Sequence, residues 1–170
     1  MKTVSKKIIL LGNVSVGKSS LIRQFVFQKF SETYLTTVGV QINKKNVVVA
    51  DTDISMIIWD IAGEITQDRV QPSYYIGAHA IIYVVDVTRP TTFSRIKNDL
   101  ELLKKQLPNA VVKVIGNKID LSSIESAMEV CANHSVKLDF FTSAKHGTNV
   151  DTMFDELAVD LIKERNIFQF

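Results

Sequence analysis

The chain has 170 residues, 46% of them apolar, which suits one domain of ordinary size with a buried core. Its 20 Lys and Arg residues nearly balance 18 Asp and Glu residues, so there is no dense basic stripe of the kind that binds nucleic acid. No apolar run approaches the roughly 20 residues of a membrane span, and no signal peptide precedes the first strand-like segment. We therefore expect one domain over residues 1–170, monomeric and cytoplasmic, with no nucleic-acid partner.

Short runs of β-branched and apolar residues alternate with longer segments of helical period. The runs are residues 7–11, 38–49, 54–61, 80–85, 111–115 and 138–141. Alternation of this kind is typical of α/β proteins, in which helices cover both faces of a mostly parallel sheet. The sequence therefore predicts an α/β fold with six strands.

The first run leads directly into GNVSVGKS, which matches the phosphate-loop pattern G-x-x-x-x-G-K-S and opens a helical segment. Glycines let the backbone wrap closely around an anion, N–H groups point inward, and the helix N-terminus adds partial positive charge. We expect this loop to bind nucleotide phosphates. The residues are Gly12, Asn13, Val14, Ser15, Val16, Gly17, Lys18, Ser19 and Ser20.

Two side chains of this loop carry specific chemistry. Lys18 is predicted to reach the β and γ phosphates and to neutralise charge during catalysis. Ser19 is predicted to place its hydroxyl on Mg²⁺, which takes few protein ligands and completes its octahedron with phosphate oxygens and water.

The second and third runs are joined only by residues 50–53, too few for a crossover helix. This predicts an antiparallel hairpin at one edge of the sheet, with right-handed crossovers elsewhere. Apolar residues then recur at spacings of three and four in two segments, which predicts two amphipathic helices. They are Phe93, Ile96, Leu100, Leu103 and Leu107, and Val150, Met153, Phe154, Leu157, Leu161 and Ile162.

The segments after the fifth and sixth runs indicate which base is bound. Asn117, Lys118 and Asp120 resemble the N-K-x-D guanine-recognition element of small GTPases, and Ser143-Ala144-Lys145 is similar to their S-A-K element. The Asp120 carboxylate can accept from the ring N–H and exocyclic amine of guanine, and adenine would leave it unpaired. The resemblance implies that Lys118 packs along the ring and Asn117 ties this loop to the phosphate loop. It also implies that the Ala144 N–H holds the guanine oxygen.

Nearly the whole chain resembles a Ras-superfamily small GTPase, and most closely the Rab branch. The segments that carry this resemblance are WDIAG at 59–63, SYYIGA at 73–78, IIYVVDVT at 81–88 and VGVQI at 38–42. The family implies a P-loop NTPase fold and a switch that binds GTP or GDP with Mg²⁺ and hydrolyses GTP. Such a switch acts in vesicle trafficking or signalling.

The family also implies roles for residues of the two switch segments, roughly 30–40 and 63–75. Asp60 would bind Mg²⁺ through water, and Thr37 would complete the Mg²⁺ shell when the γ phosphate is present. The Gly63 N–H would meet that phosphate, Phe30 would pack against the base, and Tyr34 would close over the phosphates.

Exchange factors, activating proteins and effectors would bind through these switch segments. The resemblance points to an apolar effector patch of Ile42, Trp59 and Tyr74. Ordinary packing on the sheet face explains the same three residues equally well.

Two departures from the family affect catalysis. Glu64 replaces the Gln that orients the attacking water, and brings negative charge toward the γ phosphate. Val14 replaces a small residue and would crowd the water and any arginine finger. We expect slow hydrolysis, and a GTP-bound scaffold is the alternative to a cycling switch. A P-loop kinase or ATPase is a third reading, which residues 117–120 oppose.

The sequence ends at Phe170 without the C-terminal cysteines of prenylated relatives. Either a lipidated tail lies beyond residue 170 or the protein is not lipid-anchored. Membrane binding, on the cytosolic face, is expected only in the first case.

Overall fold

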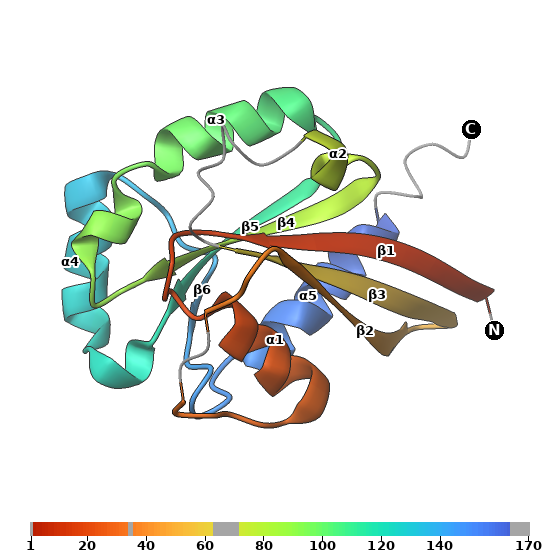
Figure 1. Ribbon diagram of the computed structural model, residues 1–170, viewed down its shortest axis with the longest axis horizontal. Coiled ribbons are helices and arrows are strands. Elements are labelled where there is room, and N and C mark those ends of the chain that lie inside the picture. The colour runs from red at the N-terminus through yellow and green to blue at the C-terminus, as the bar shows by residue number, and fades with distance from the viewer. Residues whose placement is uncertain (1, 34–35, 63–71, 164–170) are drawn as a thin grey trace.

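The computed structural model describes residues 2–33, 36–62 and 72–163 (Figure 1). Across these residues six strands, the number predicted, form one sheet in the order β2-β3-β1-β4-β5-β6. The β2–β3 pair is antiparallel and lies at the edge, and the other pairs are parallel. The strands are β1 (Lys2–Leu11), β2 (Val40–Val49), β3 (Thr52–Ile61), β4 (Ala78–Asp86), β5 (Val111–Asn117) and β6 (Phe140–Thr142).

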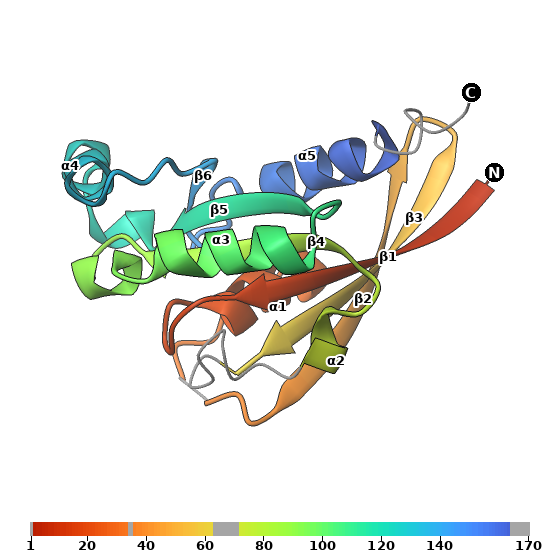
Figure 2. The same ribbon diagram turned by 90° about the horizontal axis from the view of Figure 1, so that it is seen from above.

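Helices cover both faces of this sheet (Figures 1 and 2). The α-helices are α1 (Lys18–Phe27), α2 (Pro72–Tyr75), α3 (Ile96–Gln106), α4 (Ile124–His134) and α5 (Val150–Lys163), and two 3₁₀ turns are η2 (Pro90–Phe93) and η3 (Ile119–Leu121). On one face α1 packs on α5, where the rings of Phe25 and Phe154 stack at 3.8 Å. On the other face Ile96 and Leu103 of α3 share a buried cluster with Cys131 of α4.

β1 begins at Lys2, five residues before the predicted start at residue 7. The first half of the strand is rich in lysine and serine, so it lacks the apolar run by which a strand is predicted from the sequence. Val4 nevertheless pairs with Ile54 of β3 and is buried. Pairing with a long neighbouring strand therefore extends β1 beyond its apolar run.

Other elements also differ from the predicted boundaries. β6 covers 140–142 rather than 138–141, because the backbone and side chain of Asp139 bond to Val114 before the ladder with Ile115 begins. Phe93 lies in η2, and Leu107 follows the end of α3. The helix α4 was not predicted.

The C-terminal ends of the parallel strands form one edge of the sheet, which is distinct from the edge strand β2. Open α/β sheets bind ligands at these strand ends. Asp60, Asp86, Asn117 and Thr142 stand at or near the ends of β3, β4, β5 and β6. The phosphate loop follows β1 at the same edge. The fold thus brings together side chains that are far apart in the sequence.

Candidate functional site

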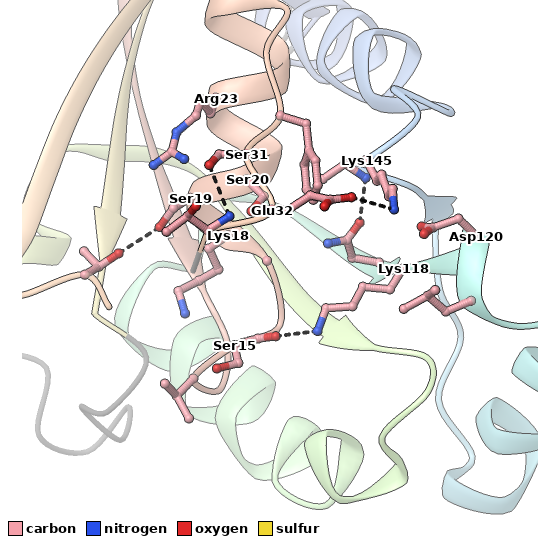
Figure 3. Close-up of a pocket in the computed structure, with 18 of the residues that line it drawn as sticks. Ser15, Lys18, Ser19, Ser20, Arg23, Ser31, Glu32, Lys118, Asp120 and Lys145 are labelled. Carbon is pink, nitrogen blue, oxygen red and sulfur yellow. Dashed lines mark hydrogen bonds and ion pairs between the residues drawn. The ribbon is translucent and has the colours of Figure 1, made fainter. Parts of the chain in front are cut away.

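A pocket of about 440 Å³ opens at this edge of the sheet (Figure 3). Its wall combines the phosphate loop and α1 with residues 30–33 and 36–37, the β5–η3 connection and the loop after β6. Those are the four regions that the sequence marked as nucleotide contacts. Predicted residues that line the cavity are Val14, Ser15, Gly17, Lys18, Ser19, Ser20, Phe30, Thr37, Asn117, Lys118, Asp120, Ala144 and Lys145.

Five other residues of the described part that were predicted to bind nucleotide or metal do not line this cavity: Gly12, Asn13, Val16, Asp60 and Ser143. Val16 and Ser143 are fully buried. Tyr34, Gly63 and Glu64 lie outside the described residues, so their predicted contacts stay predictions.

The two glycines of the phosphate loop are required by its geometry. Gly12 has φ +136°, and a Cβ there would lie 2.1 Å from the carbonyl oxygen of Val84. Gly17 has φ +99°, and a Cβ there would lie 2.3 Å from Asn117 Nδ2. A side chain at either position would be strained by the backbone and would also collide with a neighbour. The loop can therefore adopt this shape only with glycine at both positions.

Side-chain donors occupy several carbonyl oxygens of the loop. Asn117 Nδ2 donates to Val16 O at 3.0 Å, which is the tie expected of Asn117, and Lys118 Nζ donates to Ser15 O at 2.7 Å. In a trans peptide the following N–H points opposite to the carbonyl. Holding these carbonyls on Asn117 and Lys118 therefore turns the next N–H groups away from those side chains, where an anion can accept from them.

Lys18 presents a buried positive charge to the same cavity. Its side chain is 6% exposed, and Nζ donates to Gly12 O at 2.9 Å and Asn13 O at 3.1 Å. Burial lowers the Lys18 pKa to about 8, and the charge of Asp60 opposes this shift. An anion in the pocket would raise the Lys18 pKa again and so stabilise the ammonium form, because an opposite charge favours the charged state.

Ser19, Thr37 and Asp60, the three predicted metal residues, are in mutual contact. Ser19 Oγ lies 2.8 Å from Thr37 Oγ1, and Asp60 Oδ2 accepts from Ser19 Oγ and, at 3.4 Å, from Thr37. Burial raises the Asp60 pKa, while donors from Ser19 and the charge of Lys18 lower it in part. Within the described part of the chain, Asp60 Oδ1 is buried without a hydrogen-bond partner.

This donor set fits Mg²⁺. Hydroxyl and carboxylate oxygens are the ligands that Mg²⁺ takes, directly or through water. The orphaned Asp60 Oδ1 is an acceptor that a metal-bound water would satisfy. Ser19, Thr37 and Asp60 are therefore the residues that would hold the ion.

The far end of the pocket carries the side chains predicted to read the base. Ser143 Oγ donates to Asp120 Oδ1 at 2.6 Å, which fixes the carboxylate. Asn117 Oδ1 accepts from Thr142 Oγ1 at 3.1 Å and from the Ala144 N–H at 3.2 Å. The sequence analysis assigned that N–H to the guanine oxygen, but here its acceptor is the buried Asn117 amide. Its contact with guanine remains a prediction.

An ion pair in the pocket wall joins the predicted residue Lys145 to Glu32, which was not predicted. Lys145 Nζ lies 3.1 Å from Glu32 Oε1, and both residues line the cavity (Figure 3). Arg23 also lines the cavity, and its charge reaches Asp60. Arg23 follows Ser19 by one helical turn, so the period of α1 could have revealed it. Nothing in the sequence pattern indicated the pairing of Glu32.

Comparisons with known proteins agree with this geometry. The profile of the Ras family matches residues 7–163. The chain belongs to the Ras family. It is 34% identical over 162 residues to Ras-related protein Rab-13 of Canis lupus familiaris, a match that covers 92% of this chain and 79% of the relative. It is 38% identical over 163 residues to Ras-related protein RABF2a of Arabidopsis thaliana, covering 92% and 81%.

The predicted resemblance is thereby confirmed: this is a Rab-like small GTPase that binds GTP and GDP with Mg²⁺ and hydrolyses GTP. Regulators and effectors interact with members of this family. The ATPase and kinase readings are excluded, and the scaffold reading is not favoured. In the part of the chain that the structure describes, no helix combines the length and apolar character needed to cross a bilayer.

Proposed function

We propose that this Rab-like GTPase binds its nucleotide along the pocket with the phosphates at Lys18 and the base at Asp120. One observation carries this orientation. The cavity has a buried ammonium and a hydroxyl–carboxylate cluster at one end, and a carboxylate fixed by Ser143 at the other. A guanine nucleotide carries negative charge at one end and N–H donors at the other, so its polarity matches.

Each residue at the phosphate end has a distinct role in this proposal. Lys18 neutralises phosphate charge, and Ser19, Thr37 and Asp60 hold the metal. When bound, Mg²⁺ supplies charge neutralisation at the phosphate oxygens. Phe30 and Lys118 flank the base, and both line the cavity.

The orientation is tested by measuring which nucleotides bind. Fluorescence titration should give far tighter binding of GDP than ADP, and Asp120→Ala should reduce that preference. Equal affinity for GDP and ADP would contradict the proposal. The nucleotide that copurifies gives a second readout, because GDP implies turnover and GTP implies stalled hydrolysis.

We further propose that hydrolysis is slow. Val14 lines the cavity and is 38% exposed, so its branched side chain is placed to crowd a water that attacks a bound phosphate. Glu64 lies outside the described residues and supports the proposal by its charge alone. A single-turnover assay with γ-labelled GTP tests this. We expect faster release by Glu64→Gln and Val14→Gly, and rapid release that neither variant changes would contradict the proposal.

We propose that Ile42, Trp59 and Tyr74 form a patch that effectors contact. Ile42 is 56% exposed and pairs in register with Trp59 across β2 and β3. The rings of Trp59 and Tyr74 lie 6.2 Å apart. Trp59 and Tyr74 are half-buried, so together with the exposed Ile42 they bring apolar atoms to the surface, as a partner surface requires.

The patch is tested by GTP-dependent capture of proteins from a cell extract. Ile42→Ala should weaken capture while leaving GDP affinity unchanged. Val48→Ala is the matched control, because Val48 is 58% exposed on the same strand, away from the patch. Equal capture by both variants would contradict an effector role.

We also infer that the chain acts as a monomeric single domain in the cytoplasm, in vesicle trafficking or signalling. Membrane binding would need a lipidated tail beyond residue 170. Light scattering on the purified protein tests the monomer. The intact mass of the native full-length product shows whether a prenyl group is present.

A further inference from the structure

A buried carboxylate stands at the end of β4, next to the guanine-binding loop. Asp86 is 1% exposed and lies opposite Asn117 in the β4–β5 register. Its Oδ1 accepts from the N–H and hydroxyl of Thr88, at 2.9 and 2.6 Å. Its Oδ2 accepts from Lys118 Nζ at 2.6 Å and from Arg89 Nε at 3.2 Å. Two cations therefore converge on one carboxylate oxygen.

Each of these cations also holds a carbonyl of the phosphate loop. Lys118 Nζ donates to Ser15 O at 2.7 Å, and Arg89 Nη2 donates to Val14 O at 2.7 Å. The two carbonyls are consecutive, so they lie on either side of the Ser15 Cα. Asp86 thus binds both Lys118 and Arg89, and these two side chains hold the two peptide groups that flank Ser15.

That residue has an unfavourable backbone conformation. Ser15 has φ +63°, in the left-handed region that residues with a Cβ rarely adopt. Such a conformation persists only where the surroundings hold it. The hydrogen bonds from Lys118 and Arg89 fix the peptide planes on both sides of Ser15 and so stabilise its left-handed conformation.

The direction of these carbonyls determines where the loop's donors point. Because the peptide is trans, the hydrogen bond from Arg89 to Val14 O turns the Ser15 N–H the opposite way, and Ser15 lines the cavity. Lys118 does the same for the Val16 N–H, and Asn117 for the Gly17 N–H. Three consecutive peptides are thus oriented by three side chains, and the Val14–Ser15 peptide depends on Arg89.

We propose that Arg89, anchored by Asp86, is a positioning residue that holds the Ser15 N–H toward the phosphates of the bound nucleotide. The proposal rests on the placement of the phosphates proposed above. Two features distinguish Arg89 from an ordinary surface ion pair. Its partner Asp86 is buried although Arg89 itself is 40% exposed, and its second bond crosses to a loop 75 residues away.

Dissociation of a fluorescent GDP analogue, chased with excess GDP in Mg²⁺, tests the proposal. Arg89→Ala should release nucleotide about tenfold faster than the unmodified chain. Arg95→Ala is the matched control, because Arg95 also pairs with a buried aspartate, Asp99, and is 46% exposed. Arg89→Lys should not restore slow release, since a single ammonium lacks the planar fork that reaches Asp86 and Val14 together.

The ³¹P NMR spectrum of bound GDP separates positioning from general loosening. Arg89→Ala should shift a phosphate resonance, and Arg95→Ala should leave the spectrum unchanged. Release by Arg89→Ala within twofold of Arg95→Ala would overturn the proposal, as would faster release with an unchanged spectrum. Arg89→Gln serves as a second variant if the alanine variant does not fold. Failure of the unmodified chain to bind GDP would instead contradict the proposed nucleotide placement.

Discussion

Gly17 and Asn117 stand so close that no side chain fits between them. A Cβ on Gly17 would lie 2.3 Å from Asn117 Nδ2, the atom that donates to Val16 O at 3.0 Å. The phosphate loop and the guanine-binding loop are therefore in direct contact. Displacing either one moves the other, so binding of phosphate and binding of base are mechanically coupled.

We predict that Gly17→Ala lowers GDP affinity at least about a hundredfold, roughly 2.7 kcal/mol, because the new methyl displaces Asn117. Equilibrium titration with a fluorescent GDP analogue measures this. Gly77→Ala is the control: Gly77 also has positive φ, +72°, but within the described residues a Cβ there meets nothing inside 4 Å. It should lower the free energy of unfolding by about 1 kcal/mol from backbone strain and leave GDP affinity unchanged. Similar affinity losses in both variants would show that strain, not the collision, matters.

Local sequence signals predicted much of this fold. The short connection at residues 50–53 predicted the β2–β3 hairpin, which the structure confirms as the antiparallel edge. The phosphate-loop pattern between an apolar run and a helical segment located the turn from β1 into α1. These features depend on neighbours in the chain, so a sequence pattern can reveal them.

The helix α4 shows why other elements were missed. Its large apolar residues Ile124 and Met128 are exposed, while its buried positions hold the small residues Ala127 and Cys131. The usual hydrophobic signal is therefore reversed, because large apolar residues of α4 face solvent while small ones are buried. No count of apolar spacing identifies a helix of this kind.

The contacts of the candidate site were likewise predicted in part from the sequence. The contact from Asn117 to the phosphate loop was expected from family motifs, and the structure contains it. The contacts of Arg89 with Val14 and of Glu32 with Lys145 were not expected. Each joins segments far apart in the chain, and depends on strand register and loop path that no local pattern specifies.

We predict that Ser143→Ala weakens guanine recognition. Ser143 is fully buried and donates to Asp120 Oδ1 at 2.6 Å, so its loss leaves the carboxylate free to rotate. A bond to a charged group contributes about 1.5–3 kcal/mol, so GDP affinity should fall about tenfold or more. The preference for GDP over inosine diphosphate, which lacks the exocyclic amine, should also fall. Titration of both nucleotides measures this.

Ser126→Ala is the control for that experiment, since Ser126 bonds to Ser123 at the start of α4, on the exposed surface. It should leave both affinities unchanged. An unchanged preference for GDP in Ser143→Ala would show that Asp120 is held without the hydroxyl.

We predict that Asp86 stabilises the protein in a pH-dependent way. Burial acts to raise the Asp86 pKa, but donors from Lys118 and Thr88 outweigh it and hold the pKa below the ordinary value. A carboxyl with a depressed folded pKa contributes stability above its unfolded pKa of about 3.9, and that stability is lost as the pH falls through the folded pKa. Its contribution should therefore be constant from neutral pH to about pH 5 and shrink below about pH 4.

Urea unfolding at one fixed GDP concentration measures this contribution. Asp86→Asn should cost about 2 kcal/mol at pH 7, less than a fully buried pair because Lys118 and Arg89 are partly exposed. Asp51→Asn, at an exposed turn position, should change little at any pH. A penalty for Asp86→Asn that stays constant down to pH 3 would contradict an ionic role.

We predict that the bridge between Glu32 and Lys145 contributes little to nucleotide retention. The two atoms lie 3.1 Å apart, but the side chains are 81% and 45% exposed. Exposed ion pairs contribute about 0–1 kcal/mol and are screened by salt. Glu32→Ala should therefore speed GDP dissociation less than about fivefold at low salt, and the difference should disappear at high salt.

A double-mutant cycle with Lys145→Ala separates the pair from other roles of each residue. If the ion pair is the only way in which these two residues affect nucleotide retention, GDP should dissociate at the same rate from both single variants and from the double variant. A larger effect of Lys145→Ala, persisting at high salt and in the absence of Glu32, would mean that Lys145 contacts the nucleotide itself. The predicted role of Lys145 in base binding and its observed pairing with Glu32 are thereby distinguished by the salt dependence of GDP release and by the double variant.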